Sequence, residues 1–86
     1  MNILTEKKFN KAYCKLPESI KAKFKARISL FLVDEFHPLL ENHAMAGKYE
    51  GFRSINITGD FRAIYYLANQ DIVIFVNIGT HSQLYG

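Results

Sequence analysis

The chain has 86 residues, of which 49% are hydrophobic and 22% charged, a balance typical of one globular domain spanning residues 1–86. No apolar run reaches the roughly 18 residues that a membrane-spanning helix needs, so no membrane partner is expected. Cys14 is the only cysteine, which excludes an internal disulfide or a cysteine-based metal cage and favours a reducing, cytoplasmic location.

Positive charge is concentrated near the N-terminus. The formal net charge is +3, but residues 1–27 carry eight Lys or Arg against only Glu6 and Glu18. Such a one-sided field favours polyanions or an acidic protein partner. An ordinary solvated helix surface explains the same residues equally well, so charge alone does not decide between them.

The N-terminal half predicts a very short strand at residues 3–4 and then two helices. Thr5 is a good N-cap for the first helix, which runs to about residue 15. Pro17 breaks this helix and opens the second, which should stop at His37 because the next residue is proline. Apolar residues recur at helical spacing along the second helix: Ile20, Phe24, Ile28, Phe31, Leu32 and Phe36. The two helices therefore predict a hairpin with an apolar inner seam and a basic outer surface.

From residue 52 onward the hydrophobic period changes to two. Segments rich in Ile, Val, Tyr and Phe predict strands at Phe52–Thr58, Phe61–Leu67 and Ile72–Ile78. Gly59 and residues 68–71 supply short turns, so the strands should form an antiparallel meander. The expected fold class is α+β, with an N-terminal helical hairpin packed on one face of a small antiparallel β-sheet.

The sheet face away from the helices is expected to be an open concave surface. Strand alternation delivers to it either Arg62, Ile64 and Tyr66 or the opposite set of side chains. Ser54 and Asn56 likewise share one parity on the strand before. A one-residue bulge would reverse the parity, so the pattern leaves both arrangements open.

The three histidines have different settings. His37 precedes a proline at a helix end, where it can cap terminal carbonyls, and we favour that structural role over catalysis. His43 lies in a polar stretch and would by itself be an ordinary loop residue. His81 follows the end of a strongly apolar strand, where a rigid scaffold holds it and solvent can reach it. That setting suits a proton-transfer residue.

These residue types together suit RNA cleavage without a metal. The reaction needs a base for a 2′-hydroxyl, an acid for the leaving oxygen, and positive charge on the phosphate. Imidazoles can take both proton-transfer roles. Arg53 or Arg62 could hold a phosphate through its planar fork, and Phe61 or Tyr85 could stack on an extruded base. Asp60 lies in a tight turn and is explained by turn chemistry alone.

A zinc site is the competing use of His43, Asp60 and His81. No HExxH motif or clustered His/Cys spacing supports it, and Gly-rich phosphate-binding loops are absent from the sequence. We therefore expect neither a metal nor a small-molecule cofactor.

Three segments of the C-terminal half, in the expected order and spacing, resemble a known family. Residues 43–53 (HAMAGKYEGFR) resemble the His-x-Leu-x-Gly-x-aromatic pattern, ending in aromatic-Arg, of YafQ-type toxins. Residues 59–65 (GDFRAIY) resemble the Gly-Asp-Tyr-Arg segment of the wider RelE/ParE superfamily, and residues 78–86 (IGTHSQLYG) are similar to the YafQ ending Gly-Thr-His-x-x-Leu-aromatic. The N-terminal half agrees in architecture only.

This resemblance implies a toxin of a type II toxin–antitoxin pair, an mRNA interferase that cleaves mRNA on the ribosome without a metal. A tightly bound antitoxin protein would neutralise it. Carried over position by position, His81 would be the principal general acid or base, and His43 and Asp60 would assist it or position the nucleotide. The RNA-binding residues expected around them are Arg62, Arg53, Phe61, Tyr85 and Lys48.

Two positions depart from the YafQ pattern. Asn56 stands where these toxins carry another histidine, and Asn77 stands where they place an arginine. Arg62 matches an arginine used by RelE itself and could partly replace the lost charge. The alternatives are a catalytically weakened homologue that keeps only its antitoxin surface, and a ParE-like toxin that poisons DNA gyrase. The pair His43 and His81 argues against the second.

Overall fold

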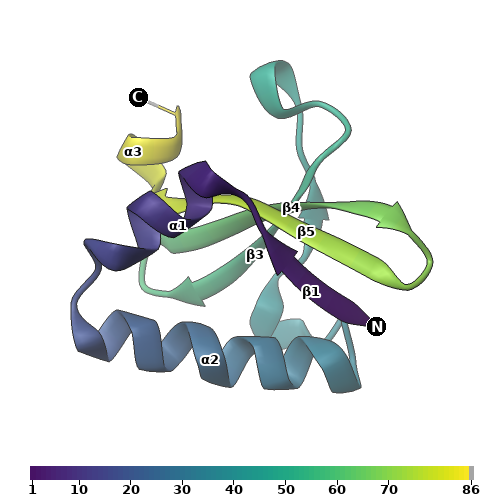
Figure 1. The fold of residues 1–86 in the computed structure, drawn as a ribbon, viewed down its shortest axis with the longest axis horizontal. Helices are drawn as coiled ribbons and strands as arrows, with labels where there is room; N and C mark the ends of the chain where they lie inside the picture. The colour runs from purple at the N-terminus through teal and green to yellow at the C-terminus, as the bar shows by residue number, and fades with distance from the viewer. Residues whose placement is uncertain (86) are drawn as a thin grey trace.

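Five strands form one mixed sheet in the order β1-β5-β4-β3-β2 (Figure 1). The computed structural model describes residues 1–85, so Gly86, the last residue of the C-terminal motif, lies outside them. The strands are β1 (Asn2–Thr5), β2 (His43–Ala44), β3 (Arg53–Thr58), β4 (Phe61–Asn69) and β5 (Ile72–Thr80). The predicted meander β3–β4–β5 and the short first strand are confirmed. The sheet is mixed because β1 pairs parallel to β5, while β2 adds an antiparallel edge that the sequence pattern did not predict.

Three α-helices and two 3₁₀ turns complete the fold. They are α1 (Lys7–Cys14), α2 (Glu18–Val33), η1 (Pro38–Leu40), η2 (Gly47–Tyr49) and α3 (His81–Tyr85). Thr5 is not the N-cap of α1 as predicted, because it belongs to β1 and pairs with Phe75; Glu6 takes the cap position. None of the helices within residues 1–85 is long and apolar enough to cross a membrane.

The second helix ends four residues before its predicted end at His37. Asp34 leaves the helix with extended backbone (φ −154°, ψ 95°), and its carboxylate accepts a hydrogen bond from the Phe36 N–H at 3.2 Å. Such a local side-chain bond offers the backbone an alternative to another helical turn. Leu32 and Phe36 are consequently 49% and 61% exposed, so the end of the predicted apolar stripe does not enter the core.

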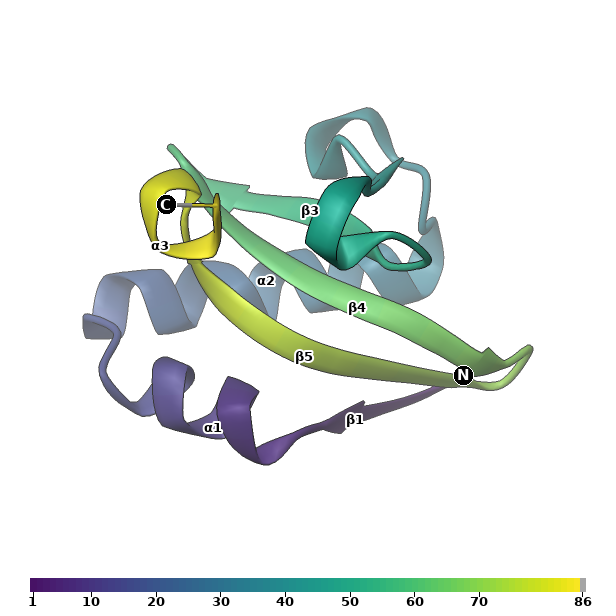
Figure 2. The same cartoon turned by 90° about the horizontal axis from the view of Figure 1, so that it is seen from above.

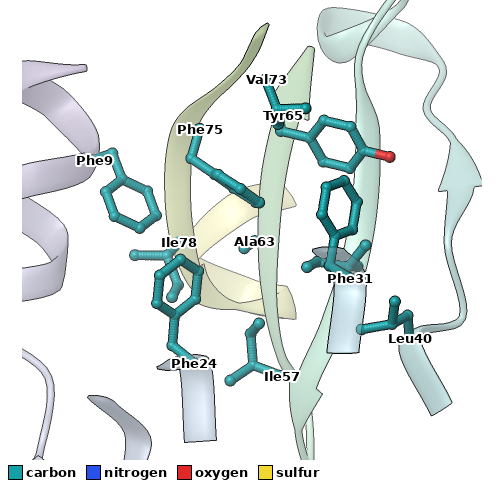
Figure 3. Close-up of a cluster of buried hydrophobic side chains, with 11 residues drawn as sticks. Phe9, Phe24, Phe31, Leu40, Ile57, Ala63, Tyr65, Val73, Phe75 and Ile78 are labelled. Carbon is teal, nitrogen blue, oxygen red and sulfur yellow. The ribbon is translucent and has the colours of Figure 1, made fainter. Parts of the chain in front are cut away.

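The main core lies between the sheet and the two long helices. Phe9 of α1 and the two α2 residues Phe24 and Phe31 meet Tyr65 and Phe75 of the sheet (Figure 3). The Phe24 and Phe75 ring centroids are 5.6 Å apart at an interplanar angle of 84°, an edge-to-face contact. Each fully buried side chain of this size contributes roughly 1.5–3 kcal/mol. The helical hairpin therefore covers one face of the sheet, and the opposite face is free of α1 and α2.

The opposite face carries the Arg62, Ile64 and Tyr66 set, which settles the parity that the sequence left open. Ser54 pairs with Ile64 and Asn56 pairs with Arg62, so their side chains share this face. The pairing register shifts between Asn56 and Thr58, between Leu67 and Asn69, and opposite Ile64 and Tyr65, where the extra residue belongs to β5. Tyr65 pairs with Phe75 while Ile64 pairs with position 77, which leaves position 76 unpaired.

This face is partly covered and is not the open surface that was expected. Residues 45–52 fold back over it, and α3 rises from the same side, opposite α2 (Figures 1 and 2). Gly47 and Gly51 make the fold-back possible, because their positive φ values of 65° and 89° are accessible mainly to glycine. A second apolar cluster results, formed by Ile64, Val76 and Leu84 with Met45, Tyr49, Phe52, Tyr66 and Ile74 around them.

Candidate functional site

Arg62 is the best-anchored polar side chain on this second face. Its Nε donates a hydrogen bond to Ser54 Oγ at 2.6 Å, and its Nη2 donates to the carbonyl oxygen of Glu41 at 2.9 Å. The side chain is only 11% exposed. Burial lowers the pKa of Arg62 from its usual value, whereas Glu41 and Tyr85 act in the opposite direction. Arginine stays protonated under such shifts, so the site contains a fixed positive charge.

His43 lies beside this guanidinium with a defined tautomer. Its Nδ1 is 2.9 Å from the Glu41 carbonyl oxygen and 3.3 Å from Arg62 Nη2. Because a carbonyl oxygen only accepts hydrogen bonds, we assign the proton to Nδ1, and Arg62 Nη2 then donates to the same carbonyl and lies near the ring nitrogen without bonding it. The lone pair is then on Nε2. The His43 side chain is exposed, and among residues 1–85 no hydrogen bond occupies Nε2.

Glu41 holds these two side chains through its backbone. Its φ of 44° and ψ of 45° are left-handed, and within residues 1–85 it is the only non-glycine residue with a positive φ. This conformation costs on the order of 1 kcal/mol and persists only where surrounding contacts hold it. Here it turns the carbonyl toward both Arg62 and His43. The Glu41 carboxylate also comes within 3.8 Å of Arg62 Nη1.

Asn42 connects the segment before His43 to the core. Its Nδ2 donates to Tyr65 Oη at 2.8 Å and to the Glu35 carbonyl at 2.9 Å, and its Oδ1 accepts from Arg53 Nε at 2.9 Å. Arg53 pairs with Tyr65, and its guanidinium lies 5.4 Å from the Phe36 ring centroid. Arg53 therefore does not lie with Arg62 as the sequence analysis expected. Through its contacts with Asn42 and Phe36, Arg53 stabilises the edge of the sheet.

Tyr65→Phe should lower the free energy of unfolding by about 1–2 kcal/mol near neutral pH, because the Asn42 amide loses a buried partner. Burial raises the pKa of Tyr65 above its usual value, although the Asn42 bond and Arg53 lower it in part. The fold thus favours the neutral phenol. The stability that Tyr65 contributes as a neutral phenol is complete below the pKa of Tyr65 in the unfolded chain, and it is lost as pH rises through the pKa of Tyr65 in the folded protein.

Urea unfolding of both proteins at about pH 8 and about pH 11 measures this linkage, since an unperturbed tyrosine titrates near pH 10. The stability gap between wild type and Tyr65→Phe should narrow at the higher pH. A stability difference of the same size at both pH values would contradict the predicted linkage to the Tyr65 pKa.

His81 is placed by the junction of β5 and α3. It is the first residue of α3, and its backbone N–H donates to the Asp60 carbonyl at 3.1 Å. Its exposed ring packs on the Tyr85 ring with centroids 4.6 Å apart. Asp60 itself is exposed in the turn between β3 and β4. His81 and Asp60 are therefore neighbours at the same end of the sheet, which motif spacing alone did not establish.

Tyr85 links α3 to the segment that covers the sheet. Its hydroxyl donates to Met45 Sδ at 3.4 Å, and its ring meets the edge of the Tyr49 ring at 6.3 Å. Asn77, turned to this face by the bulge, donates to Tyr49 Oη at 3.2 Å. Lys48 places its ammonium 5.4 Å from the Tyr49 ring centroid. Lys48 and Tyr85 therefore border the same part of the surface.

Five of the predicted residues form what we call the polar row. Its members are His43, Arg62, Tyr85, His81 and Asp60. His43 contacts Arg62, and the Tyr85 ring lies tilted against the ring of His81, whose backbone N–H bonds the Asp60 carbonyl. The two imidazoles and the carboxylate do not meet in one cluster, although the sequence analysis expected His43 and Asp60 to act together with His81. Among the described residues, no three His, Cys, Asp or Glu side chains converge closely enough to hold a metal ion.

Phe61 lies on the opposite side of the sheet from the polar row. It packs against the main core and helps to line a cavity of about 340 Å³ between the α1–α2 turn and α3. Adjacent residues of a strand point to opposite faces, so Phe61 and Arg62 could not both reach one surface. The expected contact of Phe61 with a nucleotide therefore does not fit this arrangement.

Sequence reasoning missed three contributors to this surface, namely Glu41, Met45 and Tyr49. Met45 and Tyr49 lie at motif positions of residues 43–53, but nothing local in the sequence showed that they would border this surface. Glu41 acts through a backbone carbonyl, and the other two reach the site only because residues 45–52 fold back. Ser54 was not missed in the same way, because the sequence analysis had already grouped it by strand parity. It shares strand parity with Asn56, and the pairing of the two strands then brings it to Arg62.

The fold is that of small bacterial toxins. YafQ from E. coli matches with a TM-score of 0.80 and 22% identity, over 99% of this chain and 98% of that one. A YoeB/ParE toxin from Agrobacterium tumefaciens matches with a TM-score of 0.77 and 16% identity, over 94% and 99%. A copper-bound variant toxin from Helicobacter pylori matches with a TM-score of 0.71 and 25% identity, over 99% of each chain.

The sequence model of the YafQ family, bacterial toxins of type II toxin–antitoxin systems, matches residues 1–86. The chain belongs to this family. No match was found among curated protein sequences.

Proposed function

We propose that this toxin is an endoribonuclease that cleaves mRNA on the ribosome, in the cytoplasm, by metal-free acid–base chemistry at the 2′-hydroxyl. The observation that carries the proposal is the polar row. The proposal is supported by His43, which lies beside the fixed guanidinium of Arg62, and by His81 on α3, which rises from the same side of the sheet. Proton-transfer groups flanking a phosphate-binding cation are what this reaction needs.

In the proposed reaction a base removes the proton of the 2′-hydroxyl, and the resulting oxygen attacks the adjacent phosphorus. The bond from phosphorus to the 5′-oxygen breaks, and an acid protonates that oxygen. The products are a 2′,3′-cyclic phosphate and a 5′-hydroxyl. His81 is the principal proton-transfer residue. His43, whose Nε2 carries the free lone pair, is the second, and Asp60 positions the nucleotide beside His81.

Arg62 supplies positive charge to the phosphate as negative charge develops. Its Nη1 has only the 3.8 Å contact with the exposed Glu41 carboxylate, which an incoming phosphate can displace. Tyr85 and Lys48, which border this surface, contact the nucleotide. The two departures from the family pattern do not remove this charge. The Asn56 amide bonds the Gly59 carbonyl and the Asn77 amide bonds Tyr49, so both positions have structural partners.

A protein antitoxin is the proposed partner that silences this activity. The solved complexes of E. coli include one described as a DinJ–YafQ toxin–antitoxin complex, in which the YafQ chain resembles this one with a TM-score of 0.77 and 23% identity. The exposed lysines of α1 and α2, including Lys8, Lys11, Lys23 and Lys25, suit an acidic antitoxin segment.

Purified toxin incubated with ribosomes and a defined mRNA tests the proposal. Transcript 5′ ends should map to new breaks only when ribosomes are present, and the fragments should end in 2′,3′-cyclic phosphate and 5′-hydroxyl groups. Fragments ending in 3′-hydroxyl and 5′-phosphate would contradict the 2′-hydroxyl mechanism. Intact mRNA together with gyrase-dependent DNA breaks would move the chain to the ParE-like alternative.

A further inference from the structure

Helix α3 carries two members of the polar row, His81 and Tyr85, yet it has only five residues. Helices this short do not persist by themselves in water. Leu84, which is 1% exposed, anchors α3 in the second apolar cluster, and a solvent-open pocket of about 340 Å³ lies next to it, so α3 is not packed on all sides. Something besides apolar contact must fix the orientation of α3.

A reciprocal pair of hydrogen bonds closes the start of this helix. The backbone N–H of Thr80 donates to Gln83 Oε1 at 2.8 Å, and the backbone N–H of Gln83 donates to Thr80 Oγ1 at 3.3 Å. This is the capping-box arrangement of Ser or Thr followed three residues later by Glu or Gln. His81 lies between Thr80 and Gln83 in the sequence, directly after the capping threonine.

Gly79 provides the space that this arrangement needs. A Cβ atom at position 79 would lie 2.8 Å from Gln83 Oε1 and 3.2 Å from Gln83 Cβ. A carbon and an oxygen atom that share no hydrogen bond cannot approach to 2.8 Å, so any larger residue would displace the Gln83 side chain. Gly79 is thus required because a side chain at this position would occupy the space of the Gln83 side chain. No positive φ is involved, unlike at Gly47 and Gly51.

We propose that Gln83 is a positioning residue that acts through α3 to hold the His81 and Tyr85 rings at the end of the polar row. The His81 side chain makes no hydrogen bond within the part of the chain that the structure describes, so its place depends on the α3 backbone and on Tyr85. Gln83 itself does not touch the substrate. Its effect on catalysis rests on the proposed function, whereas its effect on the position of His81 does not.

The first test is made on the free protein and needs no activity. The Tyr85 ring, 4.6 Å from His81, shifts the His81 ring-proton signals in the NMR spectrum. Gln83→Leu should move these signals toward those of an unstructured peptide, and Gln83→Glu, which keeps the accepting oxygen, should restore them. Gly79→Ala should reproduce the Gln83→Leu shift by displacing Gln83. Ser82→Ala, in the same helix, is the matched control and should leave them unchanged.

The second test measures cleavage of mRNA on ribosomes. Because a displacement of about 1 Å can cost on the order of 100-fold, we expect Gln83→Leu to lower kcat about 10-fold with little change in KM. Gln83→Glu should recover the rate. A Gln83→Leu protein with wild-type His81 signals and wild-type kcat would overturn the proposal, and so would failure of Gln83→Glu to rescue. If wild-type toxin cleaves no RNA, the proposed function fails, and the NMR comparison still decides the role of Gln83.

Discussion

His81→Ala is expected to lower kcat/KM for mRNA cleavage by about 10²–10⁴-fold, the range associated with loss of a general acid or base. The fold should survive, because the ring is exposed and is tied to the rest of the protein mainly by its contact with Tyr85. The measurement is inducible expression with growth curves and mapping of transcript 5′ ends, repeated with purified protein. Thermal unfolding of the purified variant checks that the fold is retained.

His37→Asn is the matched control for this experiment. His37 Nδ1 accepts a hydrogen bond from the Leu39 N–H at 3.1 Å and caps the start of η1. The predicted structural role is therefore present. The bond differs from the predicted one, in which His37 would donate to carbonyls at the end of a helix. Asparagine is a good N-cap and can accept the same bond. This variant should stay fully toxic. Undiminished toxicity of His81→Ala would remove His81 from the mechanism.

Arg62→Met is expected to reduce both stability and activity, and the second effect should be the larger. The substitution leaves Ser54 Oγ, which is 0% exposed, without its 2.6 Å donor, and it releases the strained Glu41 carbonyl. Hydrogen bonds to charged groups contribute about 1.5–3 kcal/mol each, so the free energy of unfolding should fall by about 3 kcal/mol. Loss of one donor to a developing negative charge typically costs about 10²–10³-fold in kcat.

Arg27→Met separates these two effects. Arg27 Nε donates to the Ile57 carbonyl at 3.1 Å on the helical side of the sheet, so it is another half-buried arginine with a backbone partner. Its replacement should lower the unfolding midpoint while cleavage per folded molecule stays at the wild-type level. Arg62→Lys keeps the charge without the planar fork and should fall between wild type and Arg62→Met. Wild-type kcat in Arg62→Met would show that Arg62 only supports the structure.

Prediction of the fold succeeded where periodicity is local and long. The three central strands, the two long helices and the α+β class follow from alternation and from breaks such as Pro17, and all are present. The end of α2 was wrong because a single Asp34 side-chain bond competes with the next helical turn. The covered second face was missed because the fold-back of residues 45–52 depends on contacts with strands that lie elsewhere in the sequence.

The structure shows that the expected site residues do not all lie on one surface, and their roles stay predictions. His43, Arg62 and His81 lie on the surface that the motifs indicated. Phe61 and Arg53 do not, and for Phe61 strand alternation alone would have shown it, since the residue next to Arg62 must face the other way. The same rule places Arg53, which pairs with Tyr65, on the helical side.

The amino-acid sequence by itself determined the class of fold, the family and the chemical groups available, because these depend on local periodicity and short motifs. Which groups meet was decided only by the tertiary structure. Strand register, the bulge at position 76 and the left-handed turn at Glu41 each depend on contacts between distant segments. Which residues a side chain contacts depends on that packing, and contacts between distant segments cannot be predicted from any single stretch of sequence.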